Sequence, residues 1–183
     1  SGNASILQIG GDPEHIRNYI QPIILSIIQT DQTTRELKMR SSIDIIDKST
    51  FETEKYEDAY KYLNNSGVQR IINTKKLYKN GRLQLYLNNC YFIFNPYFYI
   101  FEGGRHNIDF SGIEHVNGLF HNTFNYNSDT IHEMCHVKNL KITNGKTKKG
   151  GGFIARSNSK YIKVSECTTT GEIEEEGGGI FGK

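Results

Sequence analysis

The segments Asn107-Ile108-Asp109-Phe110 and Asn139-Leu140-Lys141-Ile142-Thr143 decide the fold prediction, because each alternates apolar and polar residues over a short length. A third segment, Tyr161-Ile162-Lys163-Val164, has the same pattern, and each of the three is followed by a glycine that leads two apolar residues. Alternation with a period of two is typical of a half-buried strand. Repetition of one small unit predicts stacked units, since one alone cannot bury its apolar face. We therefore expect residues 108–110, 140–142 and 162–164 to lie parallel in one ladder.

These segments resemble the repeats of right-handed parallel β-helix proteins, the pectin-lyase-like superfamily. The resemblance covers residues 54–183, and residues 54–63 are similar to the helix that caps the first repeat in that family. It implies a mostly β fold, namely a right-handed parallel β-helix (a solenoid) preceded by a short helical N-terminal segment. It implies no particular activity, because proteins of one fold have unrelated functions.

Two regions are expected from the change of pattern along the chain. Residues 1–50 are predicted to be a helical or mixed N-terminal segment that caps or oligomerises the protein, and residues 51–183 to be the N-terminal part of a β-helix that continues beyond Lys183. Asp12-Pro13-Glu14 is typical of a helix start, and a second helix is expected over residues 51–63. A short strand is expected near residues 42–46.

Glycine and asparagine mark the expected turns. The pair Asn80-Gly81 predicts a tight hairpin. The glycine triplets at residues 150–152 and 177–179 are expected where φ is positive or where a Cβ atom would clash with its surroundings.

Composition restricts the partners of this 183-residue chain. There are 22 Lys and Arg residues against 20 Asp and Glu residues, so the formal net charge of +2 makes nucleic acid an unfavoured partner. No apolar run is long enough for a membrane span. The bias toward Ile, Asn, Lys and Tyr is typical of AT-rich genomes, and large DNA viruses of amoebae carry many glycine-triplet proteins of similar appearance. A virion or an extracellular surface is therefore the favoured location, with a homo-oligomer as the expected assembly.

The sequence His132-Glu133-Met134-Cys135-His136 matches the HExxH pattern of zinc peptidases. On a helix, the two histidines would share a face and hold Zn²⁺, with Glu133 as the base toward the metal-bound water. No third ligand has a defining spacing, although carboxylates are available at Glu166, Glu172 and residues 174–176. On a strand, residues 132 and 136 would lie about 13 Å apart, too far for one metal ion. We therefore expect no metal here, and a zinc peptidase is the least favoured function.

A polysaccharide lyase or glycoside hydrolase is the alternative function. Glycoside hydrolysis needs two carboxylates on either side of the scissile bond. The sequence offers four carboxylates for such a role: Asp109, Glu114, Glu133 and Glu166. Three tyrosines are candidates for stacking on sugar rings: Tyr97, Tyr99 and Tyr126. No pair of carboxylates recurs at equivalent positions of the repeats, which is mild evidence against an enzyme.

Basic residues gather in the last third of the chain, at Lys138, Lys141, Lys146, Lys148, Lys149, Arg156, Lys160 and Lys163. On neighbouring repeats they would form a basic ridge for an acidic glycan, or a solvated face balanced by the acids at 172 and 174–176. The second interpretation is favoured. We predict a non-catalytic structural or binding module of a larger protein, with polysaccharide or glycoprotein as its partner. The sequence assigns no catalytic residue, no cofactor and no metal ligand.

Overall fold

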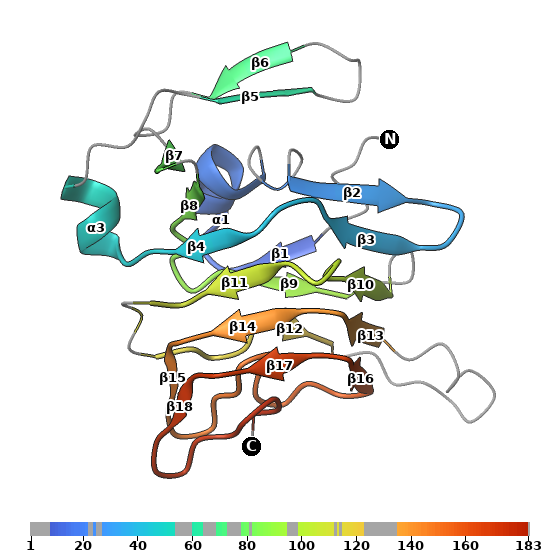
Figure 1. The fold of residues 1–183 in the computed structure, drawn as a ribbon, viewed down its shortest axis with the longest axis vertical. Helices are drawn as coiled ribbons and strands as arrows, with labels where there is room; N and C mark the ends of the chain where they lie inside the picture. Colours follow the sequence, from blue (N-terminus) through green and yellow to red (C-terminus); the bar gives the residue numbers. More distant parts are fainter. Residues whose placement is uncertain are drawn as a thin grey trace.

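The computed structural model describes residues 8–21, 24, 27–53, 60–63, 69–72, 78–80, 82–94, 99–111, 113, 115–122 and 135–182. In this part of the chain the protein is mostly β, with short strands in several layers (Figure 1). The strands are β1 (Gln8–Gly10), β2 (Ile28–Asp31), β3 (Glu36–Met39), β4 (Ile43–Ile45), β5 (Tyr60–Leu63), β6 (Gln69–Ile72), β7 (Tyr78–Lys79), β8 (Arg82–Leu85), β9 (Tyr91–Ile93), β10 (Ile100–Glu102), β11 (Asn107–Asp109), β12 (Phe120–His121), β13 (Cys135–Lys138), β14 (Lys141–Thr143), β15 (Lys146–Thr147), β16 (Ile162–Ser165), β17 (Thr168–Thr169) and β18 (Glu172–Ile173).

Two sheets contain most of these strands. One has the order β16-β13-β10-β3-β2, and the other has the order β17-β14-β11-β4-β8-β7. Both are parallel except at one end, where β2 pairs antiparallel with β3 and β7 pairs antiparallel with β8. The smaller sheets are β1-β9-β12, β15-β18 and β5-β6. The described strands therefore form mixed and parallel sheets rather than one repeated arrangement.

Equivalent apolar side chains stack on neighbouring strands and form the core. In the five-stranded sheet Leu37 pairs with Phe101 and Phe101 with Val137, and all three are at most 4% exposed. In the six-stranded sheet Ile108 pairs with both Ile43 and Ile142. Because alternate residues of a strand point to opposite faces, the polar residues between them lie outside.

The helical elements lie at the β7 end of this stack (Figure 1). Helix α1 (Pro13–His15) begins at Asp12, whose carboxylate accepts hydrogen bonds from the backbone N–H groups of Glu14 and His15 at 2.9 and 3.4 Å. The chain continues into the π-helical turn η2 (Ile16–Ile20). Ile16 and Ile20 are buried in the main core. The helix start predicted at residues 12–14 is therefore confirmed.

The predicted right-handed parallel β-helix is wrong as a description of the fold. The described strands divide among mixed and parallel sheets, and four antiparallel pairings interrupt the parallel order: β1 with β9, β2 with β3, β5 with β6, and β7 with β8. The N-terminal part is also more than a helical segment, because β3 and β4 are interior strands of the two largest sheets. Short alternating strands look alike in sequence whether they pair parallel or antiparallel, which explains the error.

The predicted single ladder is wrong for its third member. Residues 108 and 142 pair in the six-stranded sheet, but Ile162 pairs with Cys135 in the five-stranded sheet. The reason is that Cys135-His136-Val137 has the same apolar, polar, apolar order as Leu140-Lys141-Ile142. This repeat therefore contains two segments with the same apolar, polar, apolar order, and the order alone does not show which of them pairs with Ile162. The true partner of Lys141 in the next unit is Thr168.

Three shorter predictions have mixed outcomes. The strand expected near residues 42–46 is β4, and the hairpin expected at Asn80 joins β7 to β8, with φ of 54° at Asn80. The helix expected over residues 51–63 is wrong in its second half. Helix α3 spans Lys48–Thr53, but residues 60–63 form the strand β5. Tyr60 and Tyr62 have high strand propensity, which competes with the helical spacing.

The glycine triplets behave as expected at some positions only. Gly150 has φ of +79°, and a Cβ atom at Gly152 would overlap the backbone of Phe181 and Gly182. At Gly179, by contrast, a Cβ atom would make an ordinary contact of 3.5 Å with Ile173 Cδ1. Gly152 is thus required by close backbone packing, whereas Gly179 is not.

We predict that Gly152→Ala lowers the free energy of unfolding by about 1–3 kcal/mol, because the added methyl group overpacks a site bounded by backbone. Gly179→Ala is the matched control and should leave stability nearly unchanged. Chemical denaturation of both variants measures the difference. Equal stability of the two variants would contradict the packing seen at Gly152.

Candidate functional site

The HExxH motif lies only partly in the described residues, since residues 132–134 fall outside them. Cys135 and His136 both belong to the strand β13, so the strand already begins before His136. His136 Nε2 lies 2.5 Å from the hydroxyl oxygen of Ser165 on the neighbouring strand. Burial, with Lys163 and Lys138 nearby, lowers the pKa of His136. A strand at this position does not provide the continuous helical turn that places both histidines of HExxH on one metal.

The His, Cys, Asp and Glu side chains in the described part of the chain do not gather into a metal site. No cluster of three or more His, Cys, Asp or Glu side chains with suitable positions occurs there. Of the carboxylates considered as a third ligand, Glu172 forms an ion pair with Lys146 at 3.5 Å, and Glu166 occupies a turn with φ of 52°.

We predict that protein purified without added metal contains no stoichiometric zinc, and that a chelator leaves its melting temperature unchanged. Structural zinc would contribute about 10 kcal/mol or more, so its removal would be evident in a thermal melt. Zinc that is present in equimolar amount and is lost in His136→Ala would contradict this prediction.

The carboxylate Asp109 belongs to a polar row on the outer face of the six-stranded sheet. Its neighbours in register are Asp44 on β4 and Thr143 on β14. Arg82 on β8 donates to Asp44 from Nη2 and Nε at 2.8 and 3.1 Å, and Gln84 donates to the same carboxylate at 2.9 Å. Asp44, Arg82 and Gln84 were not identified from the sequence, because their relation to Asp109 depends on pairing between distant segments.

Hydrogen bonds hold Asp109 in its charged form. The amide of Asn144 and the hydroxyl and backbone N–H of Ser111 all donate to Asp109 Oδ1, at 2.8 to 2.9 Å. Burial opposes ionisation, but the donors from Asn144 and Ser111, with the charge of Arg82, lower the pKa of Asp109 overall. A carboxylate with these partners is a poor general acid. Of the other carboxylates named for catalysis, Glu114 and Glu133 lie outside the described residues.

We predict that Asp109 stabilises the fold above pH 4 and that this contribution is lost on acidification. Its pKa is below 3.8 in the folded state, so the stabilisation is present above that value and falls as the pH drops through the folded pKa. The free energy of unfolding of Asp109→Asn should therefore depend less steeply on pH below about 4. Urea unfolding at several pH values measures the slope. An unchanged slope in the variant would contradict the prediction.

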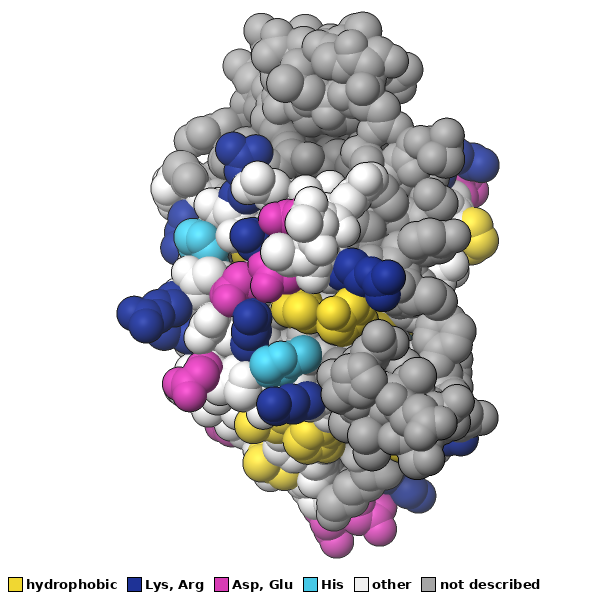
Figure 2. All heavy atoms as spheres, turned by 90° about the vertical axis from the view of Figure 1, so that its right-hand side faces the viewer, with side chains coloured by type: hydrophobic (Ala, Val, Ile, Leu, Met, Phe, Trp, Pro, Cys, Tyr) yellow, Lys and Arg dark blue, Asp and Glu magenta, His cyan; other side chains and the backbone are white. Residues whose placement is uncertain are grey.

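Three of the eight basic residues in the last third of the chain form ion pairs in the structure. Lys138 pairs with Glu36 at 3.6 Å, Lys146 with Glu172 at 3.5 Å, and Lys149 with Glu176 at 4.0 Å. Figure 2 shows acidic and basic side chains interspersed on one side of the molecule. This arrangement agrees with a solvated, balanced face rather than a ridge for an anionic polymer.

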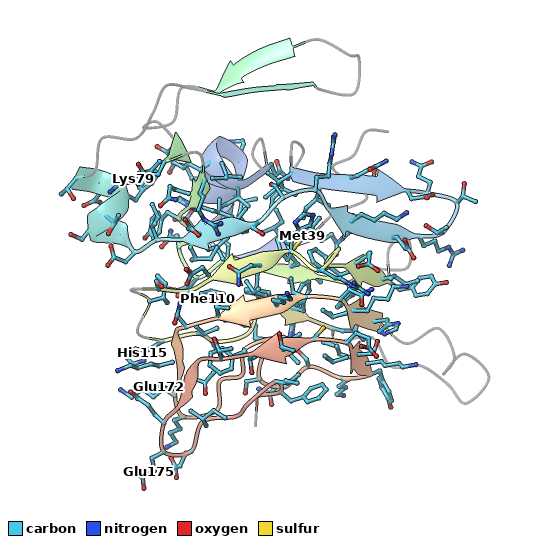
Figure 3. The ribbon with its side chains drawn as sticks, in the orientation of Figure 1. Met39, Lys79, Phe110, His115, Glu172 and Glu175 are labelled. Carbon is cyan, nitrogen blue, oxygen red and sulfur yellow. The ribbon has the colours of Figure 1, made fainter. Side chains whose placement is uncertain are left out.

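A groove of about 440 Å³ lies between two parts of the fold that are distant in sequence. One wall comprises residues 45–48, between β4 and α3, together with residues 86–90 after β8. The other wall comprises the connection from Phe110 to Leu119 and the side chain of Arg156. Figure 3 shows His115 at the edge of the fold, with Phe110 further inside. The groove therefore has an apolar floor and a polar rim.

The first wall has a defined backbone. Asn88 and Asn89 both have left-handed φ angles, of 49° and 59°, and the N–H of Cys90 donates to the carbonyl of Leu87 at 2.8 Å. Asparagine tolerates this conformation better than most residues. Tyr86 donates its hydroxyl proton to Asn88 Oδ1 at 3.0 Å, and its own carbonyl contacts His15 Nε2 at 2.6 Å. The N-terminal helix thus helps to fix the rim.

Arg156 is the best-positioned cation of the groove. Its guanidinium lies 4.0 Å from the centre of the Tyr91 ring, and Nη1 donates to the carbonyl of Asn117 at 3.4 Å. Lys48 and His115 also line the groove, and both are exposed. Among the described lining residues, Asp47 is the carboxylate, and its oxygen accepts the Thr50 N–H at 2.6 Å at the start of α3. This hydrogen bond lowers the pKa of Asp47.

The residues predicted for sugar stacking do not meet at this groove. Tyr99 lies beside β10 with Arg35 at 5.8 Å from its ring centre, and Tyr97 and Tyr126 fall outside the described residues. The groove residues Tyr86, Asn88, His115 and Asn117 were not identified from the sequence. The only local signal for them was the Asn88-Asn89 turn pair.

Comparison with known proteins gives no family assignment. No family model matches the chain, and neither the curated proteins nor the solved structures give a match. The functional argument therefore depends on the groove itself.

Proposed function

We propose that this protein is a non-catalytic binding module that takes a short stretch of acidic glycan in the groove beside Arg156. The observation that carries the proposal is the groove, which combines an apolar floor with amide, imidazole and guanidinium groups at its rim. Its volume of about 440 Å³ lies in the range of sites for small ligands. Several amide groups at one rim suit a ligand rich in hydroxyl groups, which both donates and accepts hydrogen bonds.

The charge of the rim favours a carboxylated sugar. Arg156, Lys48 and His115 line the groove, and of these Lys48 is also ion-paired with Glu52 at 3.8 Å. The carboxylate Asp47 accepts a hydrogen bond from the helix that it caps. A guanidinium presents paired donors that match the geometry of a carboxylate. Tyr91 supports Arg156 from one side, which limits the side-chain entropy lost on binding.

The geometry supports binding better than glycoside cleavage. Cleavage by the usual route needs a proton donor and a second carboxylate at a defined separation. Asp47, the carboxylate of the described lining, has a lowered pKa, and Asp109, which does not line the groove, is held by hydrogen-bond donors. Burial raises the pKa of the Cys90 thiol, which disfavours the reactive thiolate.

Location and assembly remain proposals. No helix of the described residues is both long and apolar enough to cross a membrane. A virion or an extracellular surface, where glycans are abundant, would suit the proposed ligand. Association of copies of this chain, expected from the sequence, likewise stays a proposal.

We predict that the protein binds oligogalacturonate, and that Arg156→Gln weakens this binding about tenfold or more, because a charged hydrogen bond contributes about 1.5–3 kcal/mol. Isothermal titration calorimetry measures the affinity. The methyl ester of the same oligosaccharide keeps the rings but lacks the charge, so it should bind the wild type weakly and should be insensitive to Arg156→Gln.

Arg105→Gln is the matched control, because Arg105 is an exposed arginine that does not line the groove. It should bind as the wild type does. Binding that Arg156→Gln leaves unchanged, or a preference for the methyl ester, would contradict the assignment of the groove. Release of shortened oligosaccharides during the titration would favour the enzyme alternative instead.

A further inference from the structure

Arg156 belongs to the groove and to the three-stranded sheet at the same time. Its side chain lines the groove, and its backbone N–H donates to the carbonyl of Phe120 on β12 at 2.8 Å. Gly118 lies directly against this backbone, because a Cβ atom at Gly118 would overlap the N and Cα atoms of Arg156. The guanidinium lies over the ring of Tyr91 on β9, the strand that pairs with β12. Arg156 is therefore fixed between the groove and the β1-β9-β12 sheet.

His121 lies beside this arginine on the same sheet. It follows Phe120 on β12 and is half-buried, and its ring centre lies 5.8 Å from that of Tyr91 in an edge-to-face arrangement. The Tyr91 ring is held in turn against Gly10 on β1, where a Cβ atom would overlap it. One tyrosine ring thus lies next to both the guanidinium and the imidazole, which keeps the two groups at a short and fixed separation.

The hydrogen bonds of His121 indicate where this ring takes up a proton. Its Nδ1 lies 2.8 Å from Ser159 Oγ, and the Ser159 hydroxyl donates to the carbonyl of Phe120 at 3.4 Å. Because the hydroxyl proton goes to that carbonyl, Ser159 Oγ accepts a hydrogen bond from Nδ1–H of His121. The neutral ring then has Nε2 as its basic nitrogen. Protonation at Nε2 leaves the hydrogen bond to Ser159 in place.

Arg156 is the charge that acts on His121 within the described part of the chain. The elements packed against β12 there are β9 and the segment 155–160, and their titratable or charged groups are Tyr91, Arg156 and Lys160. Burial lowers the pKa of His121, and the positive charge of Arg156 lowers it further. The imidazole is therefore mostly neutral at about pH 7.

A carboxylate that binds Arg156 opposes this effect. It places a negative charge against the guanidinium, so the electrostatic potential at His121 becomes less positive. The charged form of the imidazole is then less disfavoured, and the pKa of His121 rises in the complex. Binding free energies are reciprocal, so protonation of His121 strengthens the binding of the carboxylate by the same factor. Affinity therefore increases as the pH falls through the pKa of His121, provided that the ligand stays ionised.

We propose that His121 couples the groove to pH: an acidic glycan that binds at Arg156 is bound together with a proton, which His121 takes up from solvent at Nε2. The coupling rests on the glycan binding proposed above, and it adds a form of regulation to that site. The module holds its ligand more tightly in a mildly acidic medium than in a neutral one. His121 does not line the groove, so it acts through Arg156 rather than by contact with the ligand.

NMR titration of the histidine side chains tests the coupling at the residue concerned. Saturation with oligogalacturonate should raise the titration midpoint of His121 by about 0.7 pH units or more, which corresponds to about a fivefold gain in affinity on protonation. His106, which does not line the groove, is the internal reference, and its titration should be the same with and without the oligosaccharide. A His121 midpoint that saturation leaves unchanged would overturn the proposal.

Two variants test the electrostatic step in the absence of ligand. Arg156→Gln removes the charge and should raise the titration midpoint of His121 in the free protein. Arg156→Lys keeps the charge and is the matched control, so its midpoint should stay close to that of the wild type. A midpoint that Arg156→Gln does not change, or that both variants shift equally, would contradict the coupling.

Calorimetry in buffers of different ionisation enthalpy measures the protons taken up when oligogalacturonate binds. The wild type should take up protons at about pH 6 and should bind about fivefold more tightly at about pH 5.5 than at about pH 7.5. His121→Gln should lose most of this uptake and most of the pH dependence. Uptake that persists in full in His121→Gln would overturn the assignment to His121. Binding without proton uptake would overturn the coupling and leave the proposed function intact, whereas absence of binding would overturn both.

Discussion

Register between distant segments is the constraint on which the rest of the structure depends. When Phe101 pairs with Leu37 on one side and Val137 on the other, every alternate residue of the three strands enters the core. A slip of one residue would bring Ile100, His136 and Glu36 inside and expose the apolar set. The cost of burying Glu36 and His136 without their polar partners makes that slip unfavourable. The pairing of Leu37, Phe101 and Val137 in the core thus also sets the position of the polar residues on the outer face of the sheet.

The sequence predicted several elements correctly but not their partners. Alternation of apolar and polar residues predicted β4, β11 and β14, because burial of one face is a local property of a strand. It could not show that Ile162 pairs with Cys135 rather than with Leu140, since both candidate partners begin the same three-residue pattern. The uniform solenoid was wrong for a related reason. The alternation within an antiparallel strand such as β2 does not separate it from a parallel one, and only the β7–β8 hairpin was marked in advance, by Asn80-Gly81.

The candidate site was harder to predict than the core. Its two walls come from the ends of strands that are neighbours only through pairing, so Tyr86, His115 and Arg156 are far apart in sequence. Each is also an ordinary surface residue when taken alone. The motifs that did attract attention, His132–His136 and the run of lysines, were conspicuous by residue type. The structure assigns His136 to a hydrogen bond with Ser165 and pairs Lys138 and Lys146 with acids.

The same pairing explains why Arg156 differs from the other cations of the last third of the chain. Parallel strands in register place equivalent side chains side by side, so a lysine on one strand is near a carboxylate on a neighbouring strand or connection. Lys146 is paired in this way with Glu172 on β18, and Lys138 reaches Glu36 on β3, two strands away. Arg156 follows Ala155, whose neighbours across the ladder are Phe120 and Phe181, and neither carries a charge. Its described contacts are the Tyr91 ring and the Asn117 carbonyl, so its positive charge is held in place without a carboxylate partner. A cation that is positioned but not neutralised is the feature that an acidic ligand would use.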